Sequence, residues 1–175
     1  KPLNKVKTKF AVIPYASANV SQEFDPGKTG TDFSIGGDAK IPIGNSLNLD
    51  LTVNPDFSQV EVDELVINLT RFEAFLPEKR QFFIDNADLF SDFGNGAANP
   101  FFSRRIGIAK DLDDNNIENS IIAGARLSGK INNNLRIGLL NIQTAEDESN
   151  EIPTNNNTVV GLQQKVIKSS NIGFI

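Results

Sequence analysis

Apolar and polar residues alternate one by one along several segments of this chain, and this alternation limits the possible folds more than any other feature. In segment 47–54, leucine or valine occupies every odd position, and asparagine, aspartate or threonine every even one. Segments 31–42 and 119–131 follow the same pattern, and a further strand is expected at 158–167. Since successive side chains of a strand point to opposite faces of a sheet, each segment predicts a strand with one apolar and one polar face.

Short turns between these segments predict that neighbouring strands run antiparallel. Residues 44–46 and 132–134 are each compact enough to close a hairpin. With two more strands predicted at 59–68 and 102–109, the chain is expected to be all-β, an antiparallel up-and-down meander. One end of this meander would carry the connections 43–46, 69–101, 132–134 and 168–170, and the other end the connections 23–30, 55–58, 110–118 and 144–157.

The residue types that are missing exclude several functions. The chain has no cysteine and no histidine, which removes disulfides, thiolate zinc sites and the side chain that usually moves protons near neutral pH. A net charge of −5 argues against nucleic-acid binding, because phosphate would be repelled. Serine catalysis lacks its histidine, and with 22 acidic residues a carboxylate pair of the glycosidase kind arises too easily by chance. We therefore predict no catalytic residues.

The length of 175 residues allows one domain with its own core. No run of 18 apolar residues is present, so no membrane-spanning helix is expected. The chain contains no methionine and stops at Ile175, within what reads as a strand. We expect a single domain over 1–175 that is incomplete at both ends and belongs to a longer protein.

Several motifs follow one another in order in the middle of the chain. They are NPDFSQVE at 54–61, NLTRFE at 68–73, PEKR at 77–80, FF at 82–83 and SRRIG at 103–107. Through these motifs the chain resembles an uncharacterised domain family of Gram-negative bacteria that typically follows a carbohydrate-binding module of the family-nine type. Two places depart from the family's pattern: Gln81, where a second proline is usual, and 84–86, where Leu-Glu-Gly is usual.

The resemblance implies an outer-membrane-type β-barrel of unknown function, in contact with outer-membrane lipid. The apolar alternation would then face lipid, whereas the charged residues of the strands would face the lumen: Asp38, Lys40, Asp50, Arg126 and Lys130. The resemblance also implies a carbohydrate ligand held by a neighbouring domain, and hence a role in glycan handling or transport at the cell surface.

Two alternatives stay open. The first is a soluble all-β carbohydrate-binding module in the periplasm, because an antiparallel sheet with one wet face has the same alternation. This alternative is favoured by the absence of tryptophan and the presence of a single tyrosine, Tyr15, since membrane barrels usually carry aromatic girdles. The second is a glycan-active enzyme that uses carboxylates.

Segment 69–101 interrupts the strand pattern and is rich in phenylalanine. It holds more than half of the chain's 13 phenylalanines: Phe72, Phe75, Phe82, Phe83, Phe90, Phe93 and Phe101. One interpretation is a small satellite core that packs against a barrel rim or into the lumen; the other is a ligand-binding surface of exposed rings. We favour the satellite core.

The densest group of charges lies in this insert and just after it: Arg71, Glu73, Glu78, Lys79, Arg80, Arg104 and Arg105. Its arginines could bind an anionic ligand, such as a carboxylate or phosphate, through paired hydrogen bonds. Alternatively, the group is a structural clamp of ion pairs that holds the insert onto strand 102–109. We favour the clamp.

Asp111, Asp113 and Asp114 resemble the first residues of a calcium-binding loop. An EF-hand would require glycine at 116 and glutamate at 122, where this chain has Asn116 and Ile122. A solvated acidic loop is therefore the favoured interpretation, with a calcium site as the second. No other cofactor is expected.

Overall fold

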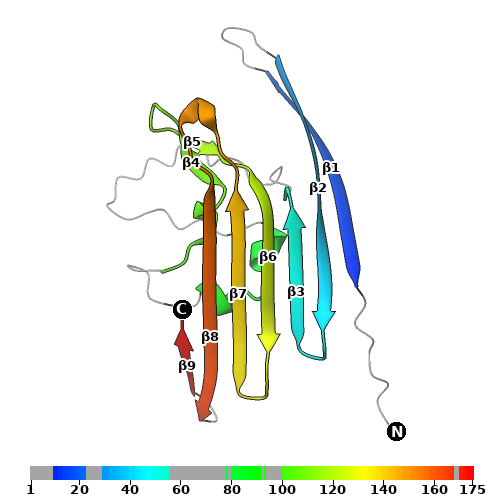
Figure 1. The fold of residues 1–175 in the computed structure, drawn as a ribbon, viewed down its shortest axis with the longest axis vertical. Coiled ribbons are helices and arrows are strands. Elements are labelled where there is room, and N and C mark those ends of the chain that lie inside the picture. Colours follow the sequence, from blue (N-terminus) through cyan, green and yellow to red (C-terminus); the bar gives the residue numbers. More distant parts are fainter. Residues whose placement is uncertain are drawn as a thin grey trace.

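The computed structural model describes residues 10–22, 29–55, 78, 80–91, 93, 100–167 and 170–175. Within these residues the chain forms one seven-stranded and one two-stranded antiparallel sheet, with short helical segments between strands (Figure 1). The strands are β1 (Ala11–Gln22), β2 (Thr29–Ile43), β3 (Leu47–Val53), β4 (Ile108–Lys110), β5 (Asn116–Glu118), β6 (Ile121–Lys130), β7 (Leu135–Thr144), β8 (Asn155–Ile167) and β9 (Ser170–Phe174). The helical segments are α1 (Gln81–Ile84), α2 (Asp88–Ser91), η1 (Ser103–Arg105) and η2 (Glu148–Asn150). None of the helices described is both long and apolar enough to cross a membrane.

The large sheet is an up-and-down meander in the order β1-β2-β3-β6-β7-β8-β9, which confirms the predicted all-β fold. The four segments with the clearest alternation became β2, β3, β6 and β8. Both predicted hairpin turns are present: Gly44 has a φ of +64°, and the side chain of Asn132 accepts hydrogen bonds from the backbone N–H groups of Asn134 (2.8 Å) and Leu135 (2.9 Å). These turns lie at one end of the sheet, and the β1–β2 and β7–β8 connections lie at the other (Figure 1).

The prediction of a strand at 102–109 is wrong. Residues 103–105 form the 3₁₀ helix η1, and residues 108–110 form β4, which pairs only with β5. The segment contains two adjacent arginines, Arg104 and Arg105, which interrupt the alternation of a strand with one buried face. Arg104 is buried on η1 instead.

In the large sheet, β3 and β6 are direct neighbours, although β4 and β5 come between them along the chain. Strand β3 pairs with β2 on one side and with β6 on the other. The predicted strand 59–68 lies outside the described residues, and the long connection between β3 and β6 leaves and re-enters the sheet at the same end. The assignment of the connections 69–101 and 110–118 to opposite ends of the meander was therefore wrong.

The register of the strands sorts their side chains onto two different faces. Every charged side chain described in the seven strands lies on one face, which we call the charged face: Asp38, Lys40, Asp50, Arg126, Lys130, Arg136 and Lys165. The opposite face, which we call the apolar face, carries no charged side chain among those described. The five residues predicted to share a face do so.

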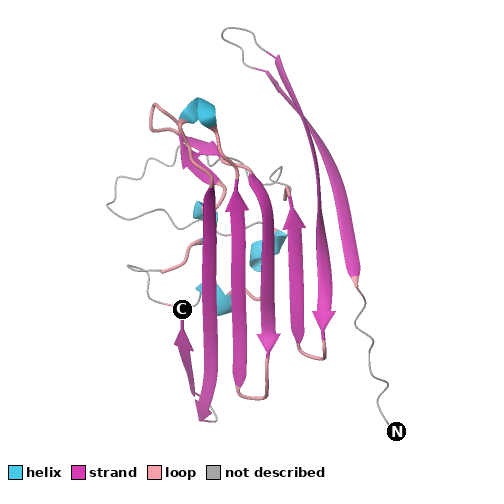
Figure 2. Ribbon diagram, in the orientation of Figure 1, coloured by secondary structure: helices cyan, strands magenta, loops and turns pink. Residues whose placement is uncertain are grey.

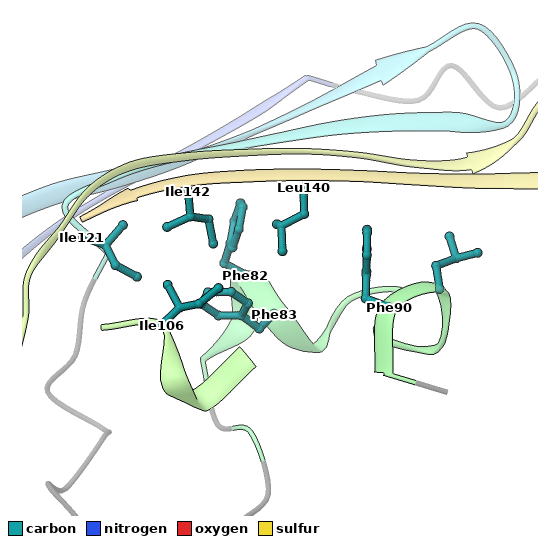
Figure 3. Close-up of a cluster of buried hydrophobic side chains, with 8 residues drawn as sticks. Phe82, Phe83, Phe90, Ile106, Ile121, Leu140 and Ile142 are labelled. Carbon is teal, nitrogen blue, oxygen red and sulfur yellow. The ribbon is translucent and has the colours of Figure 1, made fainter. Parts of the chain in front are cut away.

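The Phe-rich insert covers the middle of the charged face, where its helical segments lie against the sheet (Figure 2). Phe82, Phe83 and Phe90 are buried, and Leu89 is fully buried in the same cluster. From the sheet side, Ile121, Leu140 and Ile142 point toward these rings, as Figure 3 shows. The satellite core is thus confirmed for these three phenylalanines, whereas Phe72 and Phe75 lie outside the described residues.

Two glycines of the charged face allow the insert to approach closely. A Cβ added at Gly138 on β7 would lie 2.6 Å from the ring of Phe90, and one at Gly161 on β8 would overlap the carbonyl oxygen of Leu89. Since real carbon contacts are about 3.5–4.0 Å, any other residue at these positions would push α2 away from the sheet.

Candidate functional site: the charged cluster beneath the insert

Arg126 is the centre of a buried charged cluster between the sheet and the insert. It is 1% exposed and stands directly opposite Asp50 in the pairing of β3 with β6. Its Nη2 and Nε lie 2.7 Å and 3.2 Å from Oδ2 of Asp50. Its Nη1 donates to the carbonyl oxygen of Phe82, and its guanidinium carbon lies 5.2 Å from the centre of the Phe82 ring. Arg126 therefore joins two strands and the insert.

Asp85, at the end of α1, brings a second carboxylate to this cluster. It forms an ion pair with Lys40 of β2 and lies 3.8 Å from Nη2 of Arg126. Its other oxygen accepts a hydrogen bond of 2.7 Å from Gln81. Lys40, Asp50, Asp85 and Arg126 thus form two linked ion pairs, of which the buried one, Arg126 with Asp50, is the one that needs its partner.

A small cavity lies against this cluster. Asp38, Lys40, Gln81, Phe82 and Arg126 are among the residues around it, and its volume is about 10 Å³. A cavity of this size holds about one water molecule, so a sugar ring does not fit. Where the chain is described, this site is a polar joint between sheet and insert: Asp50 and Asp85 pair with Arg126 and Lys40, whereas Oδ1 of Asp38 is buried without a hydrogen-bond partner.

Two further contacts dock the insert along β6 and β7. Asp88 of α2 forms a two-pronged ion pair with Arg136 of β7, with nitrogen–oxygen distances of 2.5 Å and 3.2 Å. Asn86 donates a hydrogen bond of 3.0 Å to the hydroxyl of Ser128, a fully buried residue of β6. The acidic and amide groups of the insert therefore face the basic and hydroxyl groups of the sheet.

Glu78 and Arg80 form a second buried cluster, away from the sheet. Arg80 reaches both oxygens of Glu78 at 2.8 Å and donates to the carbonyl oxygens of Ser103 (2.8 Å) and Ile106 (2.6 Å). The hydroxyl of Ser103 donates to Glu78 at 2.6 Å. The guanidinium carbon of Arg80 also stacks 4.1 Å above the ring of Phe83. These contacts tie residues 78–80 to η1.

The pKa of Glu78 is set by two opposed effects. Burial alone would raise it, but hydrogen bonds from Arg80 and Ser103 and the positive charge of Arg80 bring the pKa of this carboxyl below its usual 4.5. Glu78 is therefore ionised at neutral pH, and Arg80 keeps its partner.

The other residues of the predicted charge group are distributed differently. Arg71, Glu73 and Lys79 lie outside the described residues. Arg104 is buried and Arg105 is exposed on η1. Anion binding by this group stays a prediction. Glu78 and Arg80 form a clamp of ion pairs and hydrogen bonds. The element that this clamp holds is the 3₁₀ helix η1, whereas a strand at 102–109 was predicted.

Sequence reasoning missed the residues of the insert that contact the sheet, Asp85, Asn86 and Asp88. Position 84–86 was noticed only as a departure from the family pattern. The signal that could have found them was the charge on the sheet side: Arg126 and Arg136 were isolated cations on strands, and such residues need anionic partners when they are buried.

The predicted calcium residues are not gathered around one point. Asp111 accepts hydrogen bonds from the backbone N–H groups of Asp113 (2.9 Å) and Asn115 (2.8 Å), and these bonds lower its pKa. Asp114 pairs with Lys110 at 2.8 Å. Among the residues that the structure describes, no three acidic side chains converge as metal ligands. This geometry favours the acidic turn, and calcium binding stays a prediction.

Comparison with known proteins identifies the family of this chain. A protein-family profile described as Domain of unknown function (DUF5916) matches residues 6–172. The chain belongs to the DUF5916 family. The match covers β1 to β8 and most of β9, so the sheet and its insert both belong to the DUF5916 domain. No curated protein and no solved structure matches this DUF5916 chain.

Proposed function

We propose that this DUF5916 chain is a segment of an outer-membrane β-barrel, with its apolar face on lipid and its charged face toward an interior that the insert fills. One observation carries the proposal: among the described residues, none covers the apolar face and none places a charged side chain on it. Its large exposed residues include Val12, Val20, Phe33, Ile35, Ile43, Val53, Leu139, Val160, Leu162, Val166, Ile172 and Phe174.

The degree of exposure on this face is unusual for a protein in water. Phe33 is 69% exposed, Ile35 64% and Phe174 68%. Soluble proteins rarely leave contiguous apolar patches larger than a few hundred Å² uncovered. Lipid is a suitable neighbour, because an outward apolar band is what a bilayer requires of a barrel.

Strand length supports the same proposal. A tilted membrane strand needs about 9–11 residues. Strands β1, β2, β6, β7 and β8 have 12, 15, 10, 10 and 13 residues. Strand β3 is shorter, with 7 residues. The short turns at one end and the longer connections at the other match the periplasmic and outer sides of such barrels.

The proposed cargo, a glycan, rests on the resemblance. A neighbouring carbohydrate-binding module would hold a glycan at the cell surface, which supports a role in glycan handling or transport. The cavity of about 10 Å³ beneath α1 holds about one water molecule, so a glycan would not pass at this point while α1 stays docked on the sheet.

A second candidate is a soluble β-rich carbohydrate-binding module in the periplasm, whose apolar face is covered by a further layer of protein. The lack of tryptophan and the single Tyr15 favour it, because aromatic girdles are the habit of membrane barrels.

Fractionation of the full-length protein, expressed with its own signal sequence, separates the two candidates. The barrel predicts recovery in the outer membrane and a mobility on gels that changes when the sample is boiled. Recovery as a soluble periplasmic protein, with the same mobility boiled and unboiled, would exclude the barrel.

A matched pair of arginine substitutions tests which surface meets lipid. Ile137→Arg places a charge on the apolar face of β7, opposite Leu162 of β8, whereas Leu112→Arg alters a residue that is 67% exposed in the β4–β5 connection. A lipid-facing arginine costs about 2–4 kcal/mol at the bilayer midplane. The folded, heat-modifiable fraction should fall for Ile137→Arg and stay unchanged for Leu112→Arg. Equal behaviour of the two variants would argue for water on the apolar face.

A further inference from the structure

Four glycines of the charged face lie under the insert, one on each of four adjacent strands: Gly124 on β6, Gly138 on β7, Gly161 on β8 and Gly173 on β9. A Cβ added at Gly124 would lie 3.3 Å from Cζ of Phe82, and one at Gly173 would lie 2.5 Å from Cε1 of Phe93. Gly138 and Gly161 make the close contacts with α2 described above. The four glycines thus form a path without side chains across the sheet, which we call the glycine track.

The insert follows the glycine track from one strand to the next. Phe82 lies over β6, and Figure 3 shows its ring and that of Phe90 pointing toward the sheet. Leu89 and Phe90 lie over β8 and β7, and Phe93 lies over β9. A single short stretch of chain therefore covers four neighbouring strands.

Polar contacts of the same stretch extend to β2. Asp85 forms the ion pair with Lys40 of β2. Arg126 of β6, which is 1% exposed, donates to the carbonyl oxygen of Phe82, and it would lose this acceptor if α1 lifted. The described residues between 82 and 93 therefore contact five of the seven strands of the large sheet: β2, β6, β7, β8 and β9.

Release of the insert would expose apolar side chains that are almost completely buried. Leu89 is 0% exposed, Phe90 3% and Phe82 8%. Burial of one large apolar side chain shifts an equilibrium by about tenfold or more. These three side chains together should favour the docked position by about 1,000-fold or more.

The glycine track also favours a single position of the insert. Glycine within a strand weakens the strand, because it adds conformational freedom and has no side chain to pack. The docked insert offsets this weakness by packing on the bare backbone, whereas a sheet without the insert would have four weak points side by side. A gate needs two states of similar free energy, and this sheet is shaped for one.

We infer that the insert is a fixed plug and not a gate: it stays on the glycine track while the protein works, and the barrel passes no glycan through its interior. The inference rests on the proposed membrane barrel. It decides between the two roles proposed above, since glycan handling at the cell surface needs no passage beneath the insert, whereas transport through the interior does.

Cysteine labelling tests whether the insert lifts, and the chain has no cysteine of its own. Ser128 is 0% exposed and accepts the hydrogen bond from Asn86 of the insert. Lys130 lies two residues further along β6 on the same face and is exposed. The full-length protein, with any other cysteine replaced by serine, carries Ser128→Cys or Lys130→Cys. Each variant is reconstituted into phosphatidylcholine vesicles and treated with a water-soluble maleimide.

The fixed plug predicts that Ser128→Cys reacts about 1,000-fold more slowly than Lys130→Cys. Both should react at the same rate in urea-unfolded protein, and the gel shift on boiling shows that each variant is folded. Thr52→Cys, at a position on β3 that is 2% exposed, is a second buried probe and should be protected as well. If both buried probes react within about tenfold of the rate of Lys130→Cys, the insert lifts and the fixed plug is overturned.

Vesicle swelling tests whether the interior is closed. Vesicles that contain the parent protein should swell no faster in raffinose, a neutral trisaccharide, than vesicles without protein. Labelling of Ser128→Cys is then repeated in raffinose, and its rate should not change. Faster swelling, or faster labelling in raffinose, would overturn the inference.

These failures differ from a failure of the proposed barrel. Fast labelling of Ser128→Cys in membrane-inserted, heat-modifiable protein overturns the fixed plug and leaves the barrel standing. A soluble protein with the same mobility boiled and unboiled overturns the barrel, and with it the plug.

Discussion

The close approach of the insert to β7 makes Gly138→Ala a sensitive test of the fold. The added methyl would lie 2.6 Å from Cζ of Phe90 and 3.2 Å from Cβ of Leu89. Since carbon atoms in contact prefer about 3.5–4.0 Å, α2 must move outward by about 1 Å. Overpacking of this kind costs about 1–3 kcal/mol. Release of α2 would instead expose Leu89 and Phe90 at about 1.5–3 kcal/mol each, so we expect the shift and a loss of about 1–3 kcal/mol.

Gly37→Ala is the matched control. A Cβ at Gly37 would make ordinary contacts, 3.4 Å to the carbonyl oxygen of Ile13 and 3.6 Å to Cα of Pro14. Because alanine is favoured over glycine within a strand by about 0.5–1 kcal/mol, this variant should be as stable as the parent or slightly more stable.

Urea unfolding, followed by circular dichroism and by the gel shift on boiling, measures the free energy of unfolding of both variants. Limited proteolysis under native conditions reports whether the insert has become more accessible. If Gly138→Ala is as stable as Gly37→Ala and its insert is cut no faster, α2 does not pack on β7 and the reasoning is refuted.

Three further predictions concern the buried charges and the acidic turn. Arg126→Met should lower the free energy of unfolding by about 3–5 kcal/mol, because Asp50 is left buried without its partner. Adding Asp50→Leu should recover most of this loss. Equal losses in the single and double variants would contradict the buried ion pair. The pKa of Glu78 lies below its usual 4.5, so its contribution to stability is present above that pH and is lost as the pH falls through the lowered pKa. The stability difference between the parent and Glu78→Gln should accordingly shrink in acid unfolding below pH 4.5, and a constant difference down to pH 2 would speak against the ion pair. Calorimetric titration with calcium should give the same trace for the parent protein and for Asp111→Asn, with no saturable binding that the substitution abolishes. The reason is that the oxygens of Asp111 already accept hydrogen bonds from N–H groups of its own turn.

Local patterns were sufficient to predict the strands, because the alternation of side chains along a strand depends only on backbone geometry. The segments that became β2, β3, β6 and β8 were therefore found, and so were the hairpin turns that follow β2 and β6. The prediction for segment 102–109 failed because its two adjacent arginines interrupt the alternation, and Arg104 is buried on the 3₁₀ helix η1 instead.

The candidate site could be predicted only in part. Arg126 and Lys40 were expected on one face from their phase along the strands. Asp85, the anion that joins them, is 45 residues from Lys40 in the sequence, and its neighbourhood carries no pattern of its own. The phenylalanines of the insert indicated a core, but their number does not say which surface that core would cover.

The sequence by itself determined that this chain forms strands with one apolar and one charged face, since residue type and a period of two are sufficient for that. Only the tertiary structure decided that β3 pairs directly with β6 and that the insert docks on the charged face. These features depend on register and on contacts between residues far apart in the chain, whose free energies are set by the whole packed arrangement.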